Sequence, residues 1–590
     1  MEDFDAILLE IGEFGRYQQL VMCLLCVSAC FMNAFNGYQL VFLMYTPSHQ
    51  CTLPLPAASL ENNSTTRRWL PDNLTATQCE LVYSNGSDEA YRERCHTWTY
   101  DTEYFQETII TKWNLVCSDA IYPKISLSVL SVSSIFGCLG YAFIQDRYGR
   151  KVAFDLNVAT YILGGSISLF MPSLWSFTAV RVISAMNMLS SWNISYIWSL
   201  EYCGPSKRAL VTLIMCLAYG VGMASLGLLA WATSTWVHMG LCATLPFVLL
   251  FSYHFIIMES PRWLLSQGRF GEAVVIIQRM AQWSGQKVDK QKLEQVLRRL
   301  KAHDEAADPM LQPNCNSTLS GPLNLSQNMA TVVTTVANSN ASLNDKDHVH
   351  HRPSNAIAAG QLRDLFRGRQ LRKKTGLVAF AFIANAVCYS SMSYNAENLQ
   401  GNFYVTWMLL ALVELPGQFL ILLVNKVGRI LPLSGAMLVA GICCLLAAPG
   451  DKLSAVVVTV FALAGKMAIS VAYGILYQLA GEQFPTVVRG LGIGFCALVG
   501  DAGNVLMPYI IYAATAYRML PLIIIGALAS VAGTCALFLP ETLNQYMPET
   551  LEEAEIYGKV ALGTFQANCR RLCSWRKNKT NRDNADKELC

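Results

Sequence analysis

Three ionisable residues fall near the middle of long apolar stretches: Glu414, Lys466 and Asp501. A charge at such a depth in a bilayer costs about 2.5–3.5 kcal/mol on insertion scales, so each of these residues is a candidate for function. Lys466 can neutralise one carboxylate, and we expect it to pair with Glu414. Asp501 then has no fixed partner, and a spare carboxylate at this depth suits a permeating cation. The alternative is that these groups form buried structural pairs.

Aromatic residues accompany these charges at helical spacing. Trp192 and Tyr196 are four residues apart, and Phe382 and Tyr389 are seven apart, so each pair lies on one face of a helix. Ring faces attract an organic ammonium group by about 0.5–2 kcal/mol each. Tyr473, seven residues after Lys466, is a further candidate. Ordinary packing or anchoring at the membrane surface is the alternative for any one of these rings.

The segments that carry these residues are long enough to cross a membrane. The chain has 590 residues, 53% hydrophobic and only 14% charged, whereas a soluble chain has about a quarter charged residues. About 20 apolar residues span a bilayer, and backbone groups in lipid must bond internally, so these segments are expected to be helices. Arg181 lies about four residues into its span, where its side chain can reach the outer surface. The sequence predicts an all-α membrane protein with twelve spans, at 18–44, 122–144, 153–172, 177–200, 209–231, 237–258, 376–395, 404–424, 431–449, 454–477, 490–513 and 519–539.

The loop at 45–121 combines cysteines with glycosylation sequons. Its four cysteines predict two disulfides in an oxidising compartment, with three possible pairings of Cys51, Cys79, Cys95 and Cys117. Its sequons begin at Asn62, Asn63, Asn73 and Asn85. The alternate short loops are rich in Lys and Arg, so the positive-inside rule places the two termini (1–17 and 541–590) in the cytoplasm. We therefore expect the loop at 45–121 to be extracellular.

The spans form an N-terminal half at 18–258 and a C-terminal half at 375–540, joined by a cytoplasmic central loop at 259–374. The segment 268–302 has the apolar spacing of amphipathic helices. The insert at 303–358 is rich in Asn, Ser and Thr and is expected to be disordered. Its histidines, His348, His350 and His351, could bind a metal, but a flexible polar linker is the favoured interpretation, so no metal site is predicted.

The two halves repeat the same signals at the ends of corresponding spans. The second span ends in GYAFIQDRYGRK and the eighth in VNKVGRI; the fourth ends in EYCGPSKR and the tenth in EQFPTVVR; the sixth ends in MESPRWLL and the twelfth in LPETLNQY. Three matches in the same order indicate two six-helix halves related by duplication. This architecture places a substrate between the halves near the bilayer midplane.

The charged residues at these span ends form a candidate cytoplasmic latch. Salt bridges among them can hold the cytoplasmic helix ends together, and their breaking would accompany inward opening. Interfacial charges that merely mark topology are the alternative, but the acidic members serve no topological role. Gly149 and Gly428 fit tight turns, where a positive φ costs glycine little. The latch consists of Asp146, Arg147, Arg150, Glu201 and Arg208 in one half and Lys426, Arg429, Glu482 and Arg489 in the other.

These motifs resemble those of the major facilitator superfamily. The sequence GxxxxxDRxGRK, the ESPRWLL and EQFPTVVRG stretches and a terminal LPET carry this resemblance. The cysteine-rich first loop, ITKWNLVCSD (110–119) and VELPG (413–417) resemble the organic cation, carnitine and organic anion transporter family, solute carrier family 22. The resemblance covers almost all of the chain apart from 303–358 and the tail after about residue 560. It implies a twelve-helix major facilitator fold.

The resemblance also implies a substrate-binding site. The family's anion carriers have a lysine two residues after the proline of the VELPG-like stretch and an arginine in span eleven; here these positions hold Gln418 and Asp501. Cation carriers have an aspartate in span eleven, and carnitine-type members tend to have arginine there. The pairs Trp192–Tyr196 and Phe382–Tyr389 match aromatic pairs of the family's cation pocket. Met215 departs from the glutamine typical of cation carriers, so the substrate range can differ.

These features predict a polyspecific organic cation transporter of the plasma membrane that works by alternating access. A membrane potential of about 60 mV is worth roughly 1.4 kcal/mol per charge, so it could concentrate a monovalent cation about tenfold without ATP. The expected substrates are small ammonium compounds such as monoamines or choline-like molecules. One alternative is a sodium- or proton-coupled transporter of carnitine or other zwitterions. Another is a non-transporting sensor built on a carrier fold.

Other function classes are not supported by the sequence. No GxxxxGK[ST] motif, catalytic triad or metal-ligand spacing occurs, so neither an enzyme nor a cofactor is expected. The net charge of +3 is too small to imply a nucleic-acid partner. The expected partners are a small organic cation and the lipid bilayer, and the chain is expected to function as a monomer.

Overall fold

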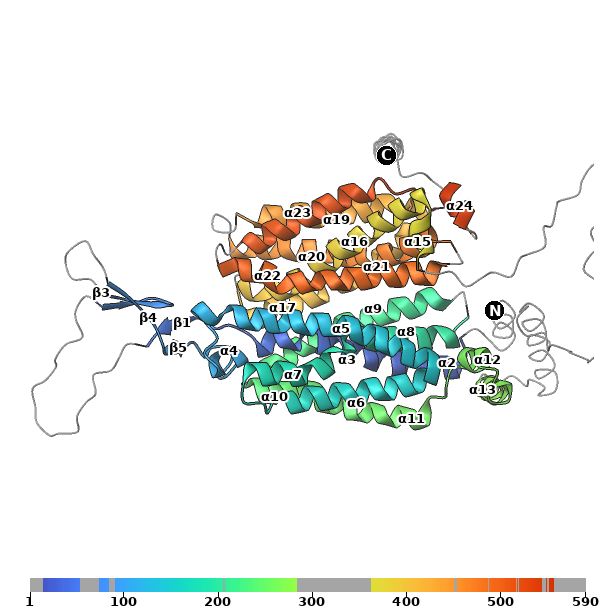
Figure 1. The fold of residues 1–590 in the computed structure, drawn as a ribbon, viewed down its shortest axis with the longest axis horizontal. Helices are drawn as coiled ribbons and strands as arrows, with labels where there is room; N and C mark the ends of the chain where they lie inside the picture. Colours follow the sequence, from blue (N-terminus) through green and yellow to red (C-terminus); the bar gives the residue numbers. More distant parts are fainter. Residues whose placement is uncertain are drawn as a thin grey trace, which may run out of the picture. The chain divides into compact units, whose positions relative to one another are not determined.

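The computed structural model describes residues 14–52, 74–83, 91–204, 207–283, 362–399, 401–449, 454–485, 488–515, 517, 519–543, 548 and 551–556. Within these ranges the side chains of Arg208 and Lys426 are not described. The predicted insert at 303–358 and the sequon residues Asn62, Asn63, Asn73 and Asn85 lie outside the described residues. Most of the described residues are helical, and the long helices run side by side (Figure 1).

The first half of the chain supplies six long segments. The first joins α2 (Arg16–Met22), the π-helical turn η1 (Cys23–Val27) and α3 (Ser28–Leu43) into one continuous helix. The others are α5 (Ile121–Tyr148), α6 (Arg150–Ser168), α7 (Leu174–Ala185) with α8 (Asn187–Tyr202), α9 (Arg208–Ala232), and α10 (Trp236–Thr244) with η4 (Leu245–Ser252) and α11 (Tyr253–Ile256).

The second half supplies six more. They are α16 (Arg369–Tyr394), α17 (Phe403–Leu412) with α18 (Glu414–Val427), α19 (Ile430–Ala447), α20 (Ala455–Gln483), α21 (Arg489–Gly503) with η9 (Asn504–Leu506), α22 (Met507–Tyr512) and η10 (Ala513–Thr515), and α23 (Leu520–Ala536). A short turn, η6 (Asn395–Asn398), follows α16. The predicted all-α architecture with twelve spans is therefore confirmed.

The outside of the helix bundle is suited to lipid. Nine helical segments in the described part of the chain are long and apolar enough to cross a membrane. The other three expected spans are α6, the α7–α8 segment and the 17-residue α23. Large apolar side chains face outward: Phe136 and Phe143 are each 65% exposed, and Leu249 is 75% exposed. Water-soluble proteins rarely expose so much apolar surface, so the chain is a multi-pass membrane protein.

The segment between α3 and α5 contains short strands that the sequence analysis did not predict. β1 (His49–Cys51) pairs antiparallel with β5 (Trp98–Tyr100), and β2 (Leu74–Ala76), β3 (Glu80–Tyr83) and β4 (Tyr91–Arg94) form a second antiparallel sheet. α4 (Ile109–Lys112) and η2 (Cys117–Asp119) follow. Of the three possible disulfide pairings, the structure has Cys51–Cys95 and Cys79–Cys117. We call this end of the bundle the loop end.

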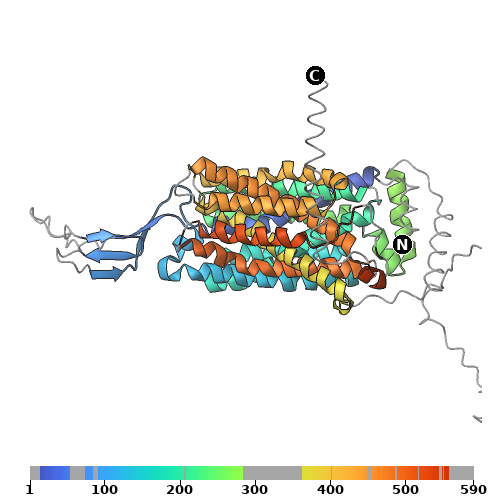
Figure 2. The same ribbon diagram turned by 90° about the horizontal axis from the view of Figure 1, so that it is seen from above.

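Short helices lie at the opposite end of the bundle, which we call the latch end (Figures 1 and 2). They are α12 (Pro261–Ser266), α13 (Phe270–Trp283), α15 (Asp364–Arg367) and α24 (Leu551–Ile556). α13 buries Val274, Ile277 and Met280 on one face, as the predicted amphipathic pattern at 268–302 requires; residues 284–302 lie outside the described part.

Candidate functional site

Lys466 and Glu414 form an ion pair inside the second half. Lys466 on α20 is fully buried, and its Nζ lies 3.1 Å from Oε1 of Glu414 on α18. The ammonium also donates to Ser393 Oγ (2.7 Å) and to the Tyr389 carbonyl (3.2 Å), and it lies 3.1 Å from the centre of the Tyr389 ring. Glu414 Oε2 accepts hydrogen bonds from the Tyr389 hydroxyl (2.9 Å) and Ser470 (3.4 Å). The buried ammonium is thus compensated within its own half.

Asp501 on α21 is arranged differently. Among the described residues, its carboxylate has neither a hydrogen bond nor an ion pair, and it is only partly buried. It lies within electrostatic range of Tyr473 and Tyr477 on α20 and of Cys138 on α5. Because α5 belongs to the first half, Asp501 faces the interface between the halves. A deep carboxylate without a fixed counter-charge attracts a mobile cation.

Two glycines let α21 bring Asp501 against α16. A Cβ added at Gly500 would lie 3.1 Å from the backbone of Phe382, and one at Gly503 would lie 2.9 Å from the Ile383 side chain. Such contacts are too tight for a larger residue, and small residues permit close helix approach in membranes. Asp501 is consequently held beside the Phe382 turn.

A row of rings runs from the surroundings of Asp501 to the Glu414–Lys466 pair. The ring centres of Phe382 and Tyr477 are 5.0 Å apart, those of Tyr477 and Tyr473 5.5 Å, and those of Tyr473 and Tyr389 5.9 Å. Tyr477 is 40% exposed and lies six residues before the end of α20, toward the latch end. The sequence analysis missed Tyr477, yet its spacing of four residues from Tyr473 places it on the same helical face.

The first half contributes Trp192 and Tyr196 from α8. The Trp192 ring lies 5.9 Å from that of Tyr219, and the Tyr196 hydroxyl lies 3.2 Å from Thr212 Oγ1. Both rings are partly buried, and Tyr196 lies within electrostatic range of Tyr477 across the interface. Asn193, which the sequence analysis did not assign to the site, donates to Cys138 Sγ at 3.5 Å.

Three other residues discussed from the sequence are covered in this conformation. Phe382 and Met215 are 0% exposed. Gln418 is buried, and its Nε2 donates to Ser470 Oγ at 3.1 Å. Phe382 contacts the Tyr477 ring at one end of the row, and Met215 lies in the apolar cluster behind Trp192 and Tyr196. None of the three presents a free surface to a ligand here.

The two halves are joined toward the loop end. Tyr404 donates to the Tyr104 carbonyl at 2.7 Å, Tyr394 to the Gly37 carbonyl at 3.1 Å, and the Trp407 indole to the Met223 carbonyl at 2.9 Å. Rings interlock at the same level, with Phe403 packed against Phe42, Tyr45 and Tyr104. These contacts close the interface at the loop end.

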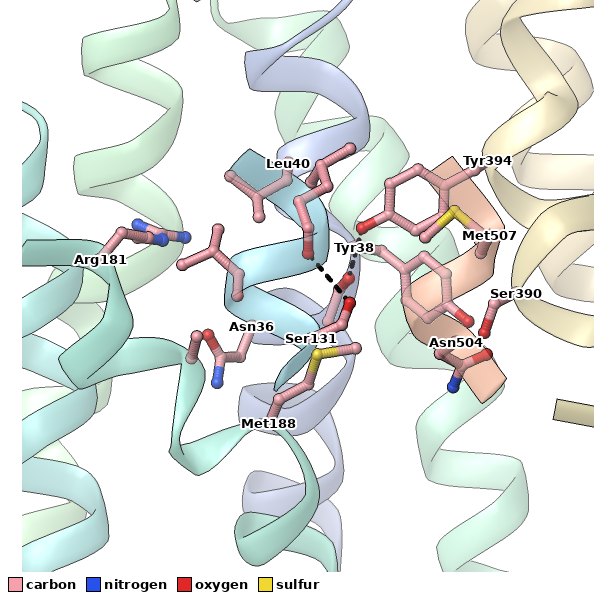
Figure 3. Close-up of a pocket in the computed structure, with 14 residues that line it drawn as sticks. Asn36, Tyr38, Leu40, Ser131, Arg181, Met188, Ser390, Tyr394, Asn504 and Met507 are labelled. Carbon is pink, nitrogen blue, oxygen red and sulfur yellow. Dashed lines mark hydrogen bonds between the residues drawn. The ribbon is translucent and has the colours of Figure 1, made fainter. Parts of the chain in front are cut away.

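A small cavity lies beside this closure and is lined by both halves (Figure 3). Its volume is about 30 Å³, which holds a water molecule or a group of similar size. Arg181 forms part of its wall. We expected the Arg181 side chain to reach the outer surface, but that expectation is wrong: Arg181 is 1% exposed. α7 packs against α3, α5 and α6, and it turns this side chain into the bundle rather than toward its rim.

At the latch end, charge networks join helices within each half. In the first half, Arg150 on α6 contacts Glu201 on α8 through Nη2 (2.7 Å) and Nε (3.0 Å), and its Nη1 contacts Asp146 on α5 at 3.2 Å. In the second half, Arg429 contacts Glu482 through Nη2 (3.0 Å) and Nε (3.1 Å). The corresponding geometry of the two pairs reflects the predicted duplication.

Two carboxylates missed by the sequence analysis complete these networks. Glu259 accepts from the backbone N–H groups of Arg150 (3.0 Å) and Lys151 (3.2 Å), and Glu541 accepts from those of Arg429 (2.8 Å) and Ile430 (3.3 Å). Each therefore satisfies N–H groups at a helix N-terminus. Burial raises the pKa of the Glu259 carboxyl, while these hydrogen bonds act to lower it. The corresponding MESPR and LPET motifs are the sequence signals from which Glu259 and Glu541 could have been identified.

The turns that Glu259 and Glu541 contact contain the two predicted glycines. Gly149 and Gly428 have φ angles of 109° and 116°. A Cβ at these positions would lie 2.3 Å from Glu259 Oε2 and 2.6 Å from Glu541 Oε2. The backbone angle therefore favours glycine, and a larger residue would also displace the carboxylate.

Other expected latch residues are placed less centrally. Arg147 is exposed and has no hydrogen bond or ion pair within the described part of the chain. Arg489 Nε donates to the Phe484 carbonyl at 3.3 Å. The side chains of Arg208 and Lys426 lie outside the described residues.

Two six-helix halves around a central interface, with matching charge networks at corresponding helix ends, define a transporter of the major facilitator type. The family described as Sugar (and other) transporter matches residues 73–338. The structure of the proton:xylose symporter XylE bound to 6-bromo-6-deoxy-D-glucose is similar, with a TM-score of 0.56 and 14% identity over 91% of this chain and 99% of that chain. The inward open conformation of XylE from E. coli has a TM-score of 0.54 and 13% identity, over 92% of this chain and 99% of that chain. These likenesses show the fold.

Sequence relatives identify the family. The organic cation transporter protein of Drosophila melanogaster is 33% identical, over 94% of this chain and 95% of that protein. The carcinine transporter of Drosophila melanogaster is 30% identical, over 94% of this chain and 80% of that protein. Solute carrier family 22 member 1 of Oryctolagus cuniculus is 28% identical, over 94% of this chain and 96% of that protein. The chain belongs to solute carrier family 22, the organic cation and carnitine transporters of the major facilitator superfamily. It is a membrane transporter and not an enzyme.

Proposed function

We propose that this chain takes up small organic cations across the plasma membrane by alternating access, driven by the membrane potential. In this proposal the transporter is polyspecific for ammonium-type substrates and functions as a monomer. Both termini are cytoplasmic, the loop end is extracellular and the latch end is cytoplasmic. Several relatives are organic cation transporters by name, which supports this substrate class.

The observation that carries the proposal is the different state of the two deep carboxylates. Glu414 has the Lys466 ammonium 3.1 Å away and a Tyr389 hydroxyl bonded to it. Asp501 has no such partner among the described residues and faces the interface between the halves. A substrate ammonium at Asp501 would supply the missing counter-charge.

Aromatic side chains would hold the organic part of the substrate. Tyr477 and Tyr473 lie beside Asp501 on one side, and Tyr196 and Trp192 approach from the other half. Their ring faces can stabilise an ammonium group by about 0.5–2 kcal/mol each. Because stacking on rings has little shape specificity, such a site accepts cations of varied structure.

Further lining would come from Phe382, Tyr389 and Gln418. These residues surround the Tyr473–Tyr477 rings and the Glu414–Lys466 pair. Their covered state here means that they would contact substrate after the halves rearrange. The Glu414–Lys466 pair would keep the second half rigid during that motion.

Alternating access would occur by rocking of two rigid halves. The contacts between halves at the loop end include Tyr404–Tyr104 and Tyr394–Gly37, and they would break in the outward-open state. The Arg150–Glu201 and Arg429–Glu482 networks each join helices of one half, so they can persist while the halves move. In this proposal the latch residues stiffen each half, and their salt bridges need not break when the transporter opens inward.

The test is uptake of labelled choline, tetraethylammonium and a monoamine into cells that express the chain. We expect saturable uptake that falls several-fold when high external potassium depolarises the membrane, since about 60 mV is worth roughly tenfold in accumulation. Replacing external sodium or changing external pH serves as the control for coupling. Uptake that requires sodium or a proton gradient and ignores potential would exclude the proposed driving force. Surface expression without uptake of any cation would exclude the substrate class.

A further inference from the structure

Asn193 on α8 is an exposed amide inside a membrane-spanning segment. Its Nδ2 donates to Cys138 Sγ on α5 at 3.5 Å, and its Oδ1 has no hydrogen-bond partner in the described part of the chain. A thiol is a weak acceptor, so the amide keeps most of its hydrogen-bonding capacity. Polar side chains inside a membrane protein are costly against lipid, so they face the bundle interior or a water-filled path and mark the route of a substrate.

The duplication of the chain shows that this amide departs from the repeat. Each half presents two rings nine and five residues before the latch glutamate of α8 or α20: Trp192 and Tyr196 before Glu201, and Tyr473 and Tyr477 before Glu482. By the same count Asn193 corresponds to Gly474. Asp501 corresponds to Gly220, because each follows the latch arginine of its half by twelve residues. Both halves therefore supply rings, but only the second supplies the carboxylate and only the first supplies the amide.

Cys138 links the amide to the surroundings of Asp501. Its thiol accepts the Asn193 N–H and lies within electrostatic range of both Asp501 and Tyr477. Tyr477 is also within electrostatic range of Tyr196, which follows Asn193 by three residues on α8. Asn193 and Asp501 therefore border the same region of the interface between the halves.

The packing of α5 against α21 gives the spacing of the two polar groups along the bundle. These helices run side by side in opposite directions (Figure 1), and Ser128 Oγ donates to the Val505 carbonyl at 3.1 Å. From this contact, Asp501 lies four residues, or about 6 Å, toward the latch end, and Cys138 lies ten residues, or about 15 Å, in the same direction. Side chains lean toward the N-terminus of their own helix, so the carboxylate and the thiol are closer along this axis than the difference of about 9 Å. A cation with a polar group a few bonds from its charged nitrogen spans such a distance between Asp501 and the Asn193 amide.

We propose that Asn193 is a specificity-determining residue that binds a hydrogen-bonding group of the substrate while Asp501 holds its ammonium group. The favoured substrate is then an organic cation with a hydroxyl or N–H group a few bonds from the charged nitrogen, as in an amino alcohol, and not an all-alkyl ammonium ion. Asn193 Oδ1 accepts the hydrogen bond, and the second N–H of Nδ2 is left to donate to an oxygen of the same group. This inference rests on the proposed function, because it needs the ammonium group at Asp501.

Binding of matched cations to the purified full-length protein tests this inference. Choline is compared with propyltrimethylammonium, and (3-hydroxypropyl)trimethylammonium with butyltrimethylammonium, so that within each pair a hydroxyl replaces a methyl group. Each ligand is titrated while the thermal unfolding midpoint is followed, because a ligand of the folded state raises that midpoint. The measured quantity is the ratio of half-effective concentrations within each pair, alkyl ligand over hydroxyl ligand.

Asn193→Leu should lower that ratio about 2- to 12-fold in at least one pair, the range expected for one net hydrogen bond. The change should fall on the hydroxyl ligand, and the alkyl ligand should bind as before. Asn193→Ala gives a second, smaller replacement with the same expected ratio, and Asn193→Gln keeps an amide and should retain part of the preference. Asp501→Asn should raise the half-effective concentrations of all four ligands. Gln267→Leu, which removes an exposed amide at the latch end, is the matched control and should change nothing.

The outcomes separate this inference from the proposed function. If the folded Asn193→Leu and Asn193→Ala proteins keep the unmodified ratio in both pairs, or weaken hydroxyl and alkyl ligands equally, the role of Asn193 is overturned while cation binding stands. A lowered ratio in these variants, with no effect of Asp501→Asn, supports the contact with Asn193 and removes Asp501 as the ammonium site. Binding of none of the four cations overturns the proposed substrate class and this inference together.

Discussion

At the scale of single residues, the charged groups inside the bundle are of two kinds: those with a charged partner among the described residues, which stabilise the structure, and those without, of which we assign Asp501 to substrate binding. Glu414 and Lys466 were identified from the sequence because charges in apolar stretches are conspicuous, and their 3.1 Å contact satisfies both. Asp501 stood out for the same reason and lacks such a contact among the described residues. If Asp501 attracts the substrate, its charge and not its size should matter.

Asp501→Asn tests this point because it removes the charge and keeps the size. We expect cation uptake to fall at least tenfold, which corresponds to about 1.4 kcal/mol for a lost ion pair in a partly desolvated site. Uptake is measured with labelled choline and normalised to surface protein. Asp101→Asn in the exposed segment at the loop end is the control. A well-expressed Asp501→Asn protein with normal uptake would move the assignment to Glu414.

Tyr477 is the second residue-scale prediction. Its ring lies between those of Phe382 and Tyr473, and 40% of its surface is exposed. Tyr477→Ala should raise the concentration of tetraethylammonium needed for half-maximal inhibition about 2- to 30-fold, in line with about 0.5–2 kcal/mol for one ring. Tyr477→Phe keeps the ring face and should stay close to the unmodified protein. Equal losses in both variants would point to the hydroxyl instead of the ring.

At the scale of elements, hydropathy located the helices better than their ends. The seventh span was predicted to begin at 376, but α16 begins at Arg369. Its first residues, including Arg372 and Lys373, are too polar for an apolar window, although the backbone continues as a helix. The strands near the loop end were not predicted because each is only 3–4 residues long, too short to show an alternating pattern. The burial of Arg181 was missed because spacing alone does not tell which face of α7 meets the bundle.

The charge networks at helix ends make a prediction about these elements. Arg150→Gln leaves Glu201 without its bidentate partner, and both side chains are only 11% exposed. Because hydrogen bonds to charged groups contribute about 1.5–3 kcal/mol, the unfolding midpoint of the purified protein should fall clearly. The double variant Arg150→Gln/Glu201→Gln should recover part of that loss. Arg429→Gln should behave like Arg150→Gln, since the second half repeats the arrangement.

The matched control for this prediction is the exposed pair Arg269–Glu272. Its side chains are 50% and 58% exposed, and surface pairs contribute less than about 1 kcal/mol. Arg269→Gln should therefore change the midpoint little. If Arg269→Gln and Arg150→Gln lower it equally, the networks have no special structural role.

At the scale of the whole molecule, the duplicated motifs predicted two six-helix halves, and the fold has them. The sequence could not show how far the halves are closed, because that depends on contacts between distant residues such as Tyr404 and Tyr104. Nor could spacing alone choose among the three disulfide pairings of the loop. Topology relative to the cell remains a prediction from charge and sequons.

Glycan mapping tests that topology. Asn→Gln changes at Asn62, Asn63, Asn73 and Asn85 should together abolish the mass shift that glycosidase treatment produces. The sequons at Asn316, Asn324 and Asn340 in the central loop serve as internal controls and should carry no glycan. Glycan found only in the central loop would reverse the assigned orientation.

The disulfides of the loop interlace, since Cys79 lies between the partners Cys51 and Cys95, and Cys95 lies between Cys79 and Cys117. A single protease cut anywhere from 52 to 116 therefore leaves the two fragments covalently joined. The alternative pairing of neighbours, Cys51 with Cys79 and Cys95 with Cys117, would release them after a cut between 80 and 94. On a denaturing gel, a nicked chain should migrate as one band without reductant and as two bands with it.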